Sequence, residues 1–499
     1  MARQGIVYIV GAGPGRPDLI TIRGLDAIKQ ADCIITDRLA SHGLLRHARP
    51  DAEVIYAPKG IGHASIAQSR INELMIQRAM EGKVVVRLKG GDPSVFARTA
   101  EELAALLTAG IPFQIIPGVT AAAGAAAYAG IMLTDRRFAS QVVFVTGHQA
   151  EDKHEGQIDW SKLANLDGTI VLYMAARNLK QIAGHLLAKG LAGSTPVAII
   201  VNATLPTQKV IRCRLDQIRG MFSENELEPP AIIIIGQVAG ADPRLEWSCR
   251  LPLSGRAILI TRDQQGNSEL ASIIEDNGGR AIAFETVRTR PLPIIATIAK
   301  LSSYDWIVFT SRRGVGSFFE QLHVSDMDAR ALGRAHVAAI GPATYQALMQ
   351  FGIKADLVPQ QYTTIALARA LIESADLRGR RILLIRSELA DERLESALKA
   401  AGGSVEQVAA YTSEPVNGDP TAIVNMLRSG QVDWVTFASS YQARVFFQQI
   451  EPQLVNSNSR VASIGPQTSA ELARLGVRVD LEAGTHTIEG LVQAIIQAN

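Results

Sequence analysis

The sequence predicts an α/β protein made of two halves. Short apolar runs of strand length alternate with helical segments along the whole chain, for example at 84–86, 142–145, 198–201 and 232–235. A chain of 499 residues is too long for one ordinary core, so two to four domains are expected. The segment 244–255 (RLEWSCRLPLSG) has no clear period, and a new strand starts at 257. We therefore expect domains at 1–247 and 256–499, with a linker at 248–255.

Composition excludes several classes of protein. Hydrophobic residues make up 47% and charged residues 20%, which is ordinary for a globular protein. A net charge of +2 gives no general attraction to nucleic acid or to an anionic membrane. The three cysteines, Cys33, Cys213 and Cys249, lack metal-site spacing, so neither a metal nor a disulfide framework is expected.

No targeting or membrane segment is expected either. The N-terminus runs directly into an apolar strand at 6–10 rather than into a signal peptide. The Ala- and Gly-rich stretch at 118–133 is shorter than the ~20 apolar residues that span a bilayer. These features predict a cytoplasmic protein without nucleic-acid or membrane partners.

The second half repeats itself at a spacing of 124 to 128 positions. Three blocks recur in the same order: ILITR (258–262) with ILLIR (382–386), DWIVFTS (305–311) with DWVTFAS (433–439), and IGPAT (340–344) with IGPQT (464–468). Each block is a strand that ends in a small polar turn before a helix. Ligands bind at such carboxyl ends, so two facing lobes predict a cleft whose backbone N–H and hydroxyl groups suit carboxylates.

Three glycine-proline turns follow strands in the first half. The first, Gly11–Gly15, does not fit a dinucleotide fingerprint, because Arg16 occupies the last glycine position and Pro14 lacks an N–H. The others are RLKGGDP at 87–93 and IPGVTA at 116–121. Sharp turns of this kind let the backbone approach a ligand closely. They predict a small-molecule site in this half.

Residues 5–245 resemble the tetrapyrrole methylase family, and within it the uroporphyrinogen-III C-methyltransferases. The motifs that carry the resemblance are VGAGPGRPDLITIRG (10–24), ITDRL (35–39), VVRLKGGDP (85–93), PGVTAAAG (117–124), YAGIML (128–133), VTGH (145–148), LYM (172–174) and PPAIIIIGQV (229–238). The resemblance implies two α/β lobes with S-adenosylmethionine in the trough between them, S-adenosylhomocysteine as product, and a homodimer formed through this half.

The resemblance also implies roles for single residues. The cofactor would lie against Pro14, Gly90, Gly91, Asp92, Val95, Thr120, Ala121, Met174 and Ala203. Asp37 would accept and Lys59 donate a proton, so that Asp37→Ala would keep cofactor binding and lose most turnover. From residue type alone, Met174 fits a core position, Asp37 a helix N-cap and Lys59 a solvated loop. Asp135-Arg136-Arg137 replaces a usual His-Arg pair, and the arginines could serve substrate carboxylates there.

Residues 256–499 resemble the uroporphyrinogen-III synthase family, through the repeated blocks, ADLVP (355–359) and the Tyr411-Thr412 pair. This implies two flavodoxin-like parallel-sheet lobes that close hydroxymethylbilane without a cofactor and invert its last pyrrole. Tyr411 would assist hydroxide departure, although a packed tyrosine is an equal reading. The candidate substrate contacts are Arg262, Thr310, Ser311, Thr344, Arg386, Ser439 and Thr468. Helix caps and surface charges are the alternatives for these seven.

The two resemblances support each other, because the synthase product is the substrate of the C-methyltransferase. Together they imply a tetrapyrrole enzyme that forms uroporphyrinogen III and methylates it twice to precorrin-2. The alternative is a different precorrin methyltransferase fused to a non-catalytic two-lobed binding module. The sequence leaves open whether the product goes to sirohaem or cobalamin.

Overall fold

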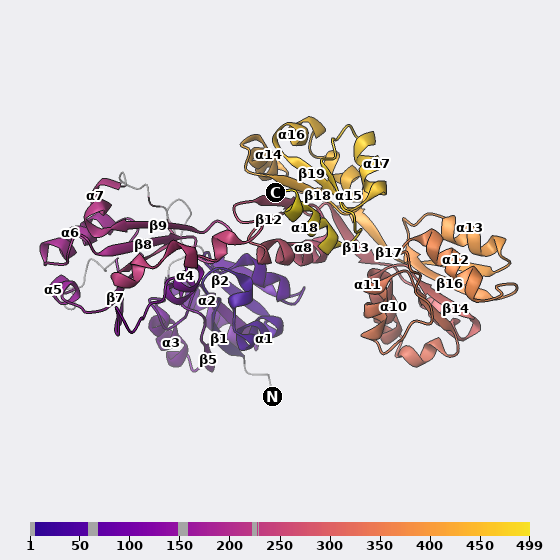
Figure 1. Cartoon of the computed structure of the whole chain (residues 1–499). Helices are drawn as coiled ribbons and strands as arrows, with labels where there is room; N and C mark the ends of the chain where they lie inside the picture. Colours follow the sequence, from indigo (N-terminus) through magenta and orange to yellow (C-terminus); the bar gives the residue numbers. More distant parts are fainter. Residues whose placement is uncertain (1–4, 58–67, 148–157, 222–226, 228) are drawn as a thin grey trace.

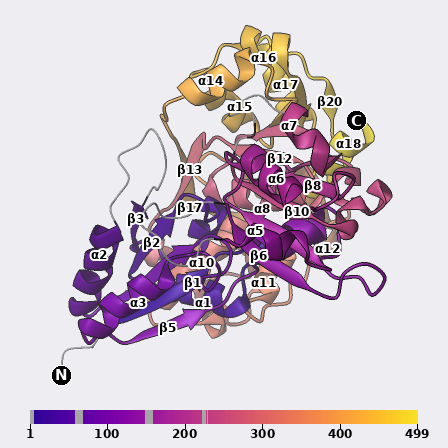
Figure 2. The same ribbon diagram turned by 90° about the vertical axis from the view of Figure 1, so that its left-hand side faces the viewer.

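The computed structural model describes residues 5–57, 68–147, 158–221, 227 and 229–499. Four five-stranded sheets, two in each half of the chain, account for its α/β architecture (Figures 1 and 2). This confirms the α/β class and the two-lobed organisation of both halves.

The first sheet is entirely parallel and has the order β3-β2-β4-β1-β5. Its strands are β1 (Ile6–Gly11), β2 (Cys33–Asp37), β3 (Glu53–Ala57), β4 (Val84–Lys89) and β5 (Phe113–Ile116), with helices α1 (Ile22–Gln30), α2 (Gln68–Met80) and α3 (Thr99–Thr108). Every residue of the central strand β4 is buried, as expected for a parallel strand covered on both faces. Because the five strands are parallel, their carboxyl ends lie at the same edge of the sheet.

The second sheet is mixed, with the order β6-β7-β10-β8-β9. Its strands are β6 (Val142–Thr146), β7 (Thr169–Tyr173), β8 (Pro196–Val201), β9 (Lys209–Arg214) and β10 (Ala231–Ile235), with helices α4 (Ala121–Tyr128), α5 (Trp160–Ala164), α6 (Leu179–Ala188) and α7 (Ile218–Met221). The alanine-rich helix α4 packs on it through Ala122, Ala125 and Ala126. Small side chains allow this close approach of helix to sheet.

The segment between the halves packs against the first half. Two single-turn 3-10 helices, Pro243–Leu245 and Ser248–Arg250, follow β10. The Trp247 Nε1–H donates to the Ala127 carbonyl at 2.9 Å, and the Ser248 hydroxyl donates to the Tyr128 carbonyl at 2.9 Å. The sequence showed no period here because these contacts are made by isolated side chains.

The third and fourth sheets form the two lobes of the second half. The third, parallel throughout, has the order β12-β11-β18-β19-β20; the fourth has the order β13-β17-β16-β14-β15, with only β13 antiparallel. The third contains β11 (Ala257–Ile260), β12 (Arg280–Ala283), β18 (Trp434–Phe437), β19 (Arg460–Ser463) and β20 (Leu481–Glu482), with α8 (Gln264–Asp276), α14 (Thr421–Arg428), α15 (Ser440–Phe447), α16 (Pro452–Asn458), α17 (Pro466–Arg474) and α18 (Ile488–Gln497). The fourth contains β13 (Val287–Pro291), β14 (Trp306–Phe309), β15 (His336–Ala339), β16 (Arg381–Ser387) and β17 (Ser404–Pro415), with α9 (Ile295–Ile298), α10 (Arg312–Val324), α11 (Pro342–Met349), α12 (Thr364–Ser374) and α13 (Arg393–Ala400).

These two lobes repeat one another in detail. Strand β14 lies between β16 and β15, and β18 lies between β11 and β19. Asp305 accepts a hydrogen bond from the Arg381 N–H at 2.8 Å, and Asp433 accepts one from the Ala257 N–H at 2.7 Å. The repeated Asp-Trp pair of the sequence therefore fixes the same strand junction twice.

The chain passes between these lobes through β13 and the long strand β17, which Figure 1 shows running from one lobe to the other. The two crossings are hydrogen-bonded together, with the Val416 N–H donating to the Thr286 carbonyl at 2.8 Å. A narrow two-stranded ribbon is thus the covalent link between the two lobes. Within the described ranges, no helix has the length and apolar character that a membrane crossing needs.

Candidate functional site

The three glycine turns of the first half meet at the carboxyl edge of the first sheet. The loop after β1 pairs with the loop after β4: the Gly91 N–H donates to the Gly13 carbonyl at 2.7 Å, and the Gly13 N–H to the Gly91 carbonyl at 3.2 Å. A Cβ at Gly118 would lie 2.4 Å from the Gly91 carbonyl oxygen. Only glycine permits this backbone-to-backbone packing.

Asp92 fixes the third turn to the second. Its carboxylate accepts from the Gly118 N–H at 2.9 Å and from the Ser94 N–H at 2.7 Å. Asp92 is therefore an organiser of these loops, and its partly exposed carboxylate still has acceptor capacity for a ligand hydroxyl.

The backbone around these loops is strained. Six described residues other than glycine have a positive φ, and five of them lie in this half. They are Phe96, Arg98, Met174, Asn202 and Thr204. Such conformations cluster at ligand sites, where the surrounding structure over-determines them. Phe96 and Arg98 follow β4 of the first sheet, whereas the other three residues follow β7 and β8 of the second sheet. Both lobes therefore contribute strained loops.

The loops of the second lobe reach the first glycine turn directly. The Thr204 hydroxyl accepts from the Arg16 N–H at 3.1 Å, and a Cβ at Gly15 would meet both that hydroxyl and the Ala203 carbonyl. Pro14 packs against Gly124 of α4. Pro14 and Ala203, which are 189 positions apart in the sequence, are thus brought to one place.

Tyr173 is a residue of this region that the sequence analysis missed. Its hydroxyl lies 2.7 Å from the Thr120 hydroxyl and accepts from the Ala122 N–H at 3.1 Å. Burial raises the pKa of Tyr173, so the phenol stays neutral. Its role was hidden because the LYM motif does not show which loop the ring reaches.

Met174 follows Tyr173 and leaves the core. Its side chain is 55% exposed, and Phe96 and Phe144, which flank the Tyr173 ring, are also partly exposed. Val95 packs nearby against the cluster that includes Ala122. An apolar surface therefore lies beside the backbone donors of the glycine loops, which is the combination an adenosine ligand requires.

Asp37 lies at the end of β2, next to this region. The Arg87 Nη2 donates to the Asp37 Oδ1 at 2.6 Å, and the Asp37 side chain remains 22% exposed. The turn after Asp37 contacts the second glycine loop, because a Cβ at Gly90 would lie 3.1 Å from the Leu39 Cβ. Lys59 lies outside the described residues.

The Asp135 turn does not present two free arginines. Arg137 donates to both Asp135 oxygens, and this pairing lowers the pKa of Asp135 to about 2. Arg137 is therefore already paired with a carboxylate at this turn, and a substrate-carboxylate role for Arg136 and Arg137 stays a prediction.

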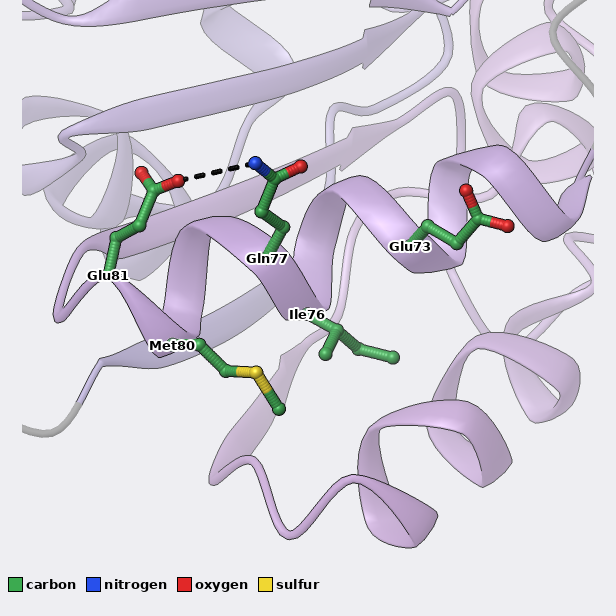
Figure 3. A pocket seen from close by; sticks show the side chains of 5 residues that line it. All are labelled: Glu73, Ile76, Gln77, Met80 and Glu81. Atoms are coloured by element: carbon green, nitrogen blue, oxygen red, sulfur yellow. Dashed lines mark hydrogen bonds between the residues drawn. The ribbon is translucent and has the colours of Figure 1, made fainter.

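A hollow of about 500 Å³ lies elsewhere, along the outer surface of α2 (Figure 3). Its lining comes from Glu73, Ile76, Gln77, Met80 and Glu81. These residues precede the amino end of β4, whereas the glycine loop follows its carboxyl end, so the hollow and the glycine loops lie at opposite ends of this strand. It belongs to a helix surface rather than to the ligand region.

In the second half, Tyr411 of β17 lies beside one of the predicted contacts, Ser311. Its hydroxyl is 3.0 Å from the Ser311 hydroxyl, and its side chain is almost buried. Ser311 caps α10 by accepting from the Gly314 N–H at 3.0 Å. The Thr310 hydroxyl lies within 3.5 Å of the Ile385 carbonyl. Ser439 caps α15 in the same way in the other lobe.

The other predicted contacts are buried within their own lobes. Thr344 and Thr468 lie inside the first turns of α11 and α17. Arg262 donates to the Gly266 carbonyl and Arg386 to the Asp391 carbonyl, and burial lowers the pKa of both guanidinium groups. Neither arginine directs its full fork into the cleft in this conformation.

Two arginines that the sequence analysis did not select form ion pairs between the two lobes. Arg312 donates to Glu269 at 2.8 Å and Arg313 donates to Asp263, both from the start of α10 to α8 of the opposite lobe. Their cross-lobe partners could not be seen before the lobes were placed.

Two family descriptions match the chain, one for each half. Residues 6–219 match "Tetrapyrrole (Corrin/Porphyrin) Methylases", and residues 268–493 match "Uroporphyrinogen-III synthase HemD". The class defined by the fold and these matches is a methylase fused to a two-lobed synthase.

Two relatives identified by sequence agree with this class. The "Porphyrin biosynthesis protein HemD" of Ruminiclostridium josui is 30% identical over 99% of this chain and 98% of its own length. The "Uroporphyrinogen-III C-methyltransferase" of Bacillus subtilis is 39% identical over 66% of this chain and 68% of its own. A Thermus thermophilus uroporphyrin-III C-methyltransferase structure, complexed with S-adenosyl homocysteine, is 33% identical and covers 47% of this chain and 99% of that one, with a TM-score of 0.41.

The chain therefore belongs to the tetrapyrrole methylase family through its first half and to the uroporphyrinogen-III synthase family through its second. It is an enzyme of tetrapyrrole biosynthesis with uroporphyrinogen-III C-methyltransferase and uroporphyrinogen-III synthase activities.

Proposed function

We propose that the chain performs two consecutive reactions, each in its own half. Residues 256–499 close hydroxymethylbilane to uroporphyrinogen III, and residues 1–247 methylate that product twice to precorrin-2, with 248–255 as the connection. The observation that carries this proposal is the junction of three glycine turns with strained loops of a second lobe, separate from the cleft beside Tyr411.

The residues of the first site fit S-adenosylmethionine. Gly90, Gly91 and Thr120 offer backbone groups to adenine and its ribose, Asp92 offers a carboxylate to a hydroxyl, and Met174 offers an apolar wall. Pro14, Val95, Ala121 and Ala203 complete the proposed contacts. Bound there, the cofactor supplies an electrophilic methyl group on a sulfonium.

Asp37 is the proposed electrostatic partner of the reacting pyrrole. A pyrrole carbon that gains a methyl group makes its ring positive until a proton leaves. A carboxylate held at the edge of the site stabilises that charge and can accept the proton. Lys59 is proposed to return a proton.

The second site works by folding a flexible polycarboxylate. Hydroxyls and helix N-termini at Thr310, Ser311 and Ser439 can bind carboxylates, and holding the ends of the substrate together supplies much of the rate. Tyr411 is proposed to donate a proton to the departing hydroxide, beside Ser311. The proposed substrate set also includes Arg262, Thr344, Arg386 and Thr468.

We further propose a cytoplasmic homodimer formed through the first half. Exposed apolar side chains on that half support it, including Ile22, Leu107, Ile115 and Met132. Light scattering of the chain and of residues 1–247 alone tests it; a monomeric full chain would contradict it.

The decisive experiment supplies hydroxymethylbilane to the purified chain, with and without S-adenosylmethionine. We expect uroporphyrinogen III without the methyl donor and precorrin-2 with it. Formation of isomer I alone would contradict the synthase proposal and favour a binding module. Isomer III that accumulates unmethylated would instead favour a methyltransferase for a later precorrin. Asp37→Ala and Tyr411→Phe serve as opposite controls, since each should impair only one reaction.

A further inference from the structure

Four charged side chains form one connected group beneath the glycine loops. They are Asp37 at the end of β2, Arg87 and Lys89 on β4, and Glu102 on α3. The Arg87 and Glu102 side chains are completely buried, and that of Lys89 is 2% exposed. Asp37 is the member of the group that reaches the surface of the site.

Glu102 is at the centre of this group. Its Oε1 accepts from the Arg87 Nε at 3.0 Å and from the Gln68 Nε2 at 3.1 Å, and its Oε2 accepts from the Lys89 Nζ at 2.6 Å. Burial alone would raise the pKa of Glu102, but the adjoining cations Arg87 and Lys89 outweigh burial and lower it. Glu102 is therefore an anion that the two cations hold in place.

Arg87 binds both Glu102 and Asp37 and so connects the two carboxylates. While its Nε is bound to Glu102, its Nη1 donates to the Ile35 and Leu88 carbonyls at 3.3 Å each, and its Nη2 donates to Asp37 at 2.6 Å. The plane of the guanidinium is thus set by contacts on three sides. Among the described residues, none donates a hydrogen bond to the Asp37 Oδ2, and the Asp37 side chain is 22% exposed, so this oxygen is available to a substrate.

Stability does not account for this arrangement. Moving the three charges of Arg87, Lys89 and Glu102 out of water costs several kcal/mol per ion, and an apolar replacement of such a group is often as stable. Arg87 and Lys89 also share the sheet face on which Val85 packs into an ordinary apolar core with Ile71 and Met75. The polar group begins only where that face reaches the carboxyl end of β4, next to the glycine loop.

We propose that Glu102 is a positioning residue for methyl transfer, acting through Arg87 to hold the Asp37 carboxylate toward the substrate. This inference rests on the proposed role of Asp37. It gives Arg87 and Lys89 of the RLKGGDP segment and the distant Glu102 a single purpose, and it extends the site to a residue that touches neither cofactor nor substrate.

A double-mutant cycle tests the inference. Glu102→Gln keeps the size of the side chain and removes its charge, so Arg87 loses its anchor. We expect kcat for methylation to fall about 10- to 100-fold, the loss typical of a misplaced catalytic group, with an unchanged Kd for S-adenosylhomocysteine. In an Asp37→Asn background, the same substitution should cost less than about twofold, because its effect runs through Asp37.

The controls separate the possible failures. Glu73→Gln on α2, whose exposed carboxylate is paired with Arg70 away from the glycine loops, should leave kcat unchanged. The synthase rate of each variant reports whether the chain is folded. Full methylation by Asp37→Asn would overturn the proposed function itself. If Asp37→Asn lowers kcat for methylation and Glu102→Gln lowers it again by the same factor in that background, only the positioning role would be overturned.

A second variant covers the case in which Glu102→Gln does not fold. Arg87→Lys keeps the buried positive charge but loses the fork that joins Glu102 to Asp37. We expect Arg87→Lys to lower kcat by the same factor in the natural chain and to have no such effect in the Asp37→Asn background. An unchanged kcat in the natural chain would overturn the inference.

Discussion

The Arg16 guanidinium lies 2.6 Å from the Asp276 carboxylate and so joins the two halves of the chain. Arg16 follows the first glycine turn, and Asp276 ends α8, whose other end carries the Asp263 contact across the synthase cleft. Arg16 also donates to the Glu275 carbonyl at 3.1 Å, where a cation meets the negative end of the helix. One helix therefore connects the edges of both sites.

The contact at this end of α8 should make stability depend on pH. Burial raises the pKa of Glu275 above its ordinary value of 4.5, although Arg46 and Arg16 oppose the rise. A carboxyl group whose pKa is raised by folding stabilises the folded state below pH 4.5. This stabilisation is lost as the pH rises through the pKa that the group has in the folded state. Glu275→Gln should therefore be more stable than the natural chain at neutral pH and equal to it near pH 4, as measured by urea unfolding.

Arg16→Ala is the matched variant for that measurement. Loss of the guanidinium should raise the pKa of Glu275 further and widen the neutral-pH difference. Asp276→Asn should cost less than about 1 kcal/mol, since the Asp276 side chain is mostly exposed. A Glu275→Gln effect that is the same at both pH values would show that the carboxylate does not titrate against folding.

Tyr173→Phe should loosen the cofactor loop. The variant removes the hydroxyl that contacts Thr120 and the Ala122 N–H and leaves a buried donor unsatisfied, at a cost of about 1 kcal/mol. Calorimetric titration with S-adenosylhomocysteine should show about five- to tenfold weaker binding. Tyr128→Phe, a half-buried tyrosine on the same helix as Ala122, is the control. Unchanged affinity in Tyr173→Phe would exclude the loop from cofactor binding.

The sequence predicted the backbone features of the fold better than the directions of its side chains. The repeated Asp-Trp blocks predicted the duplicated lobes, because the same contiguous residues recur in each block, whatever distant strand its Asp binds. The glycine turns were visible for the same reason: close backbone packing requires glycine, whatever lies opposite.

Side-chain directions were less predictable. Arg262 and Arg386 were selected as carboxylate contacts, yet both turn toward carbonyls of their own lobes. Arg312 and Arg313 were overlooked because their partners lie on the facing lobe. Glu102 was missed because a single buried acid in a helix has no local signature, and its partners lie on strand β4 and helix α2.

Arg312 and Arg313 should govern substrate affinity in the synthase half. They pair with acids across the cleft, and a polycarboxylate substrate offers competing partners for the same guanidinium groups. Replacing both with alanine should raise KM for hydroxymethylbilane about tenfold and weaken its salt dependence. Arg330→Ala, a surface arginine of the same lobe paired with Asp328, is the control. An unchanged KM would place the substrate away from α10.

Tyr411→Phe should separate the chemistry of the two halves most clearly. The Tyr411 and Ser311 hydroxyls are 3.0 Å apart, so either can orient the other toward a departing hydroxide. If Tyr411 is the proton donor, kcat for cyclisation should fall about 100-fold, while methylation of supplied uroporphyrinogen III stays unchanged.

Ser311→Ala distinguishes donation from packing in that experiment. Ser311 caps α10, so its loss should cost about 1 kcal/mol of stability but only a small part of kcat. If both variants lost kcat equally, the hydroxyl pair would act as one unit. If Tyr411→Phe kept full cyclisation with type-III product, Tyr411 would be a packing residue, and hydroxide departure would depend on another donor in the cleft.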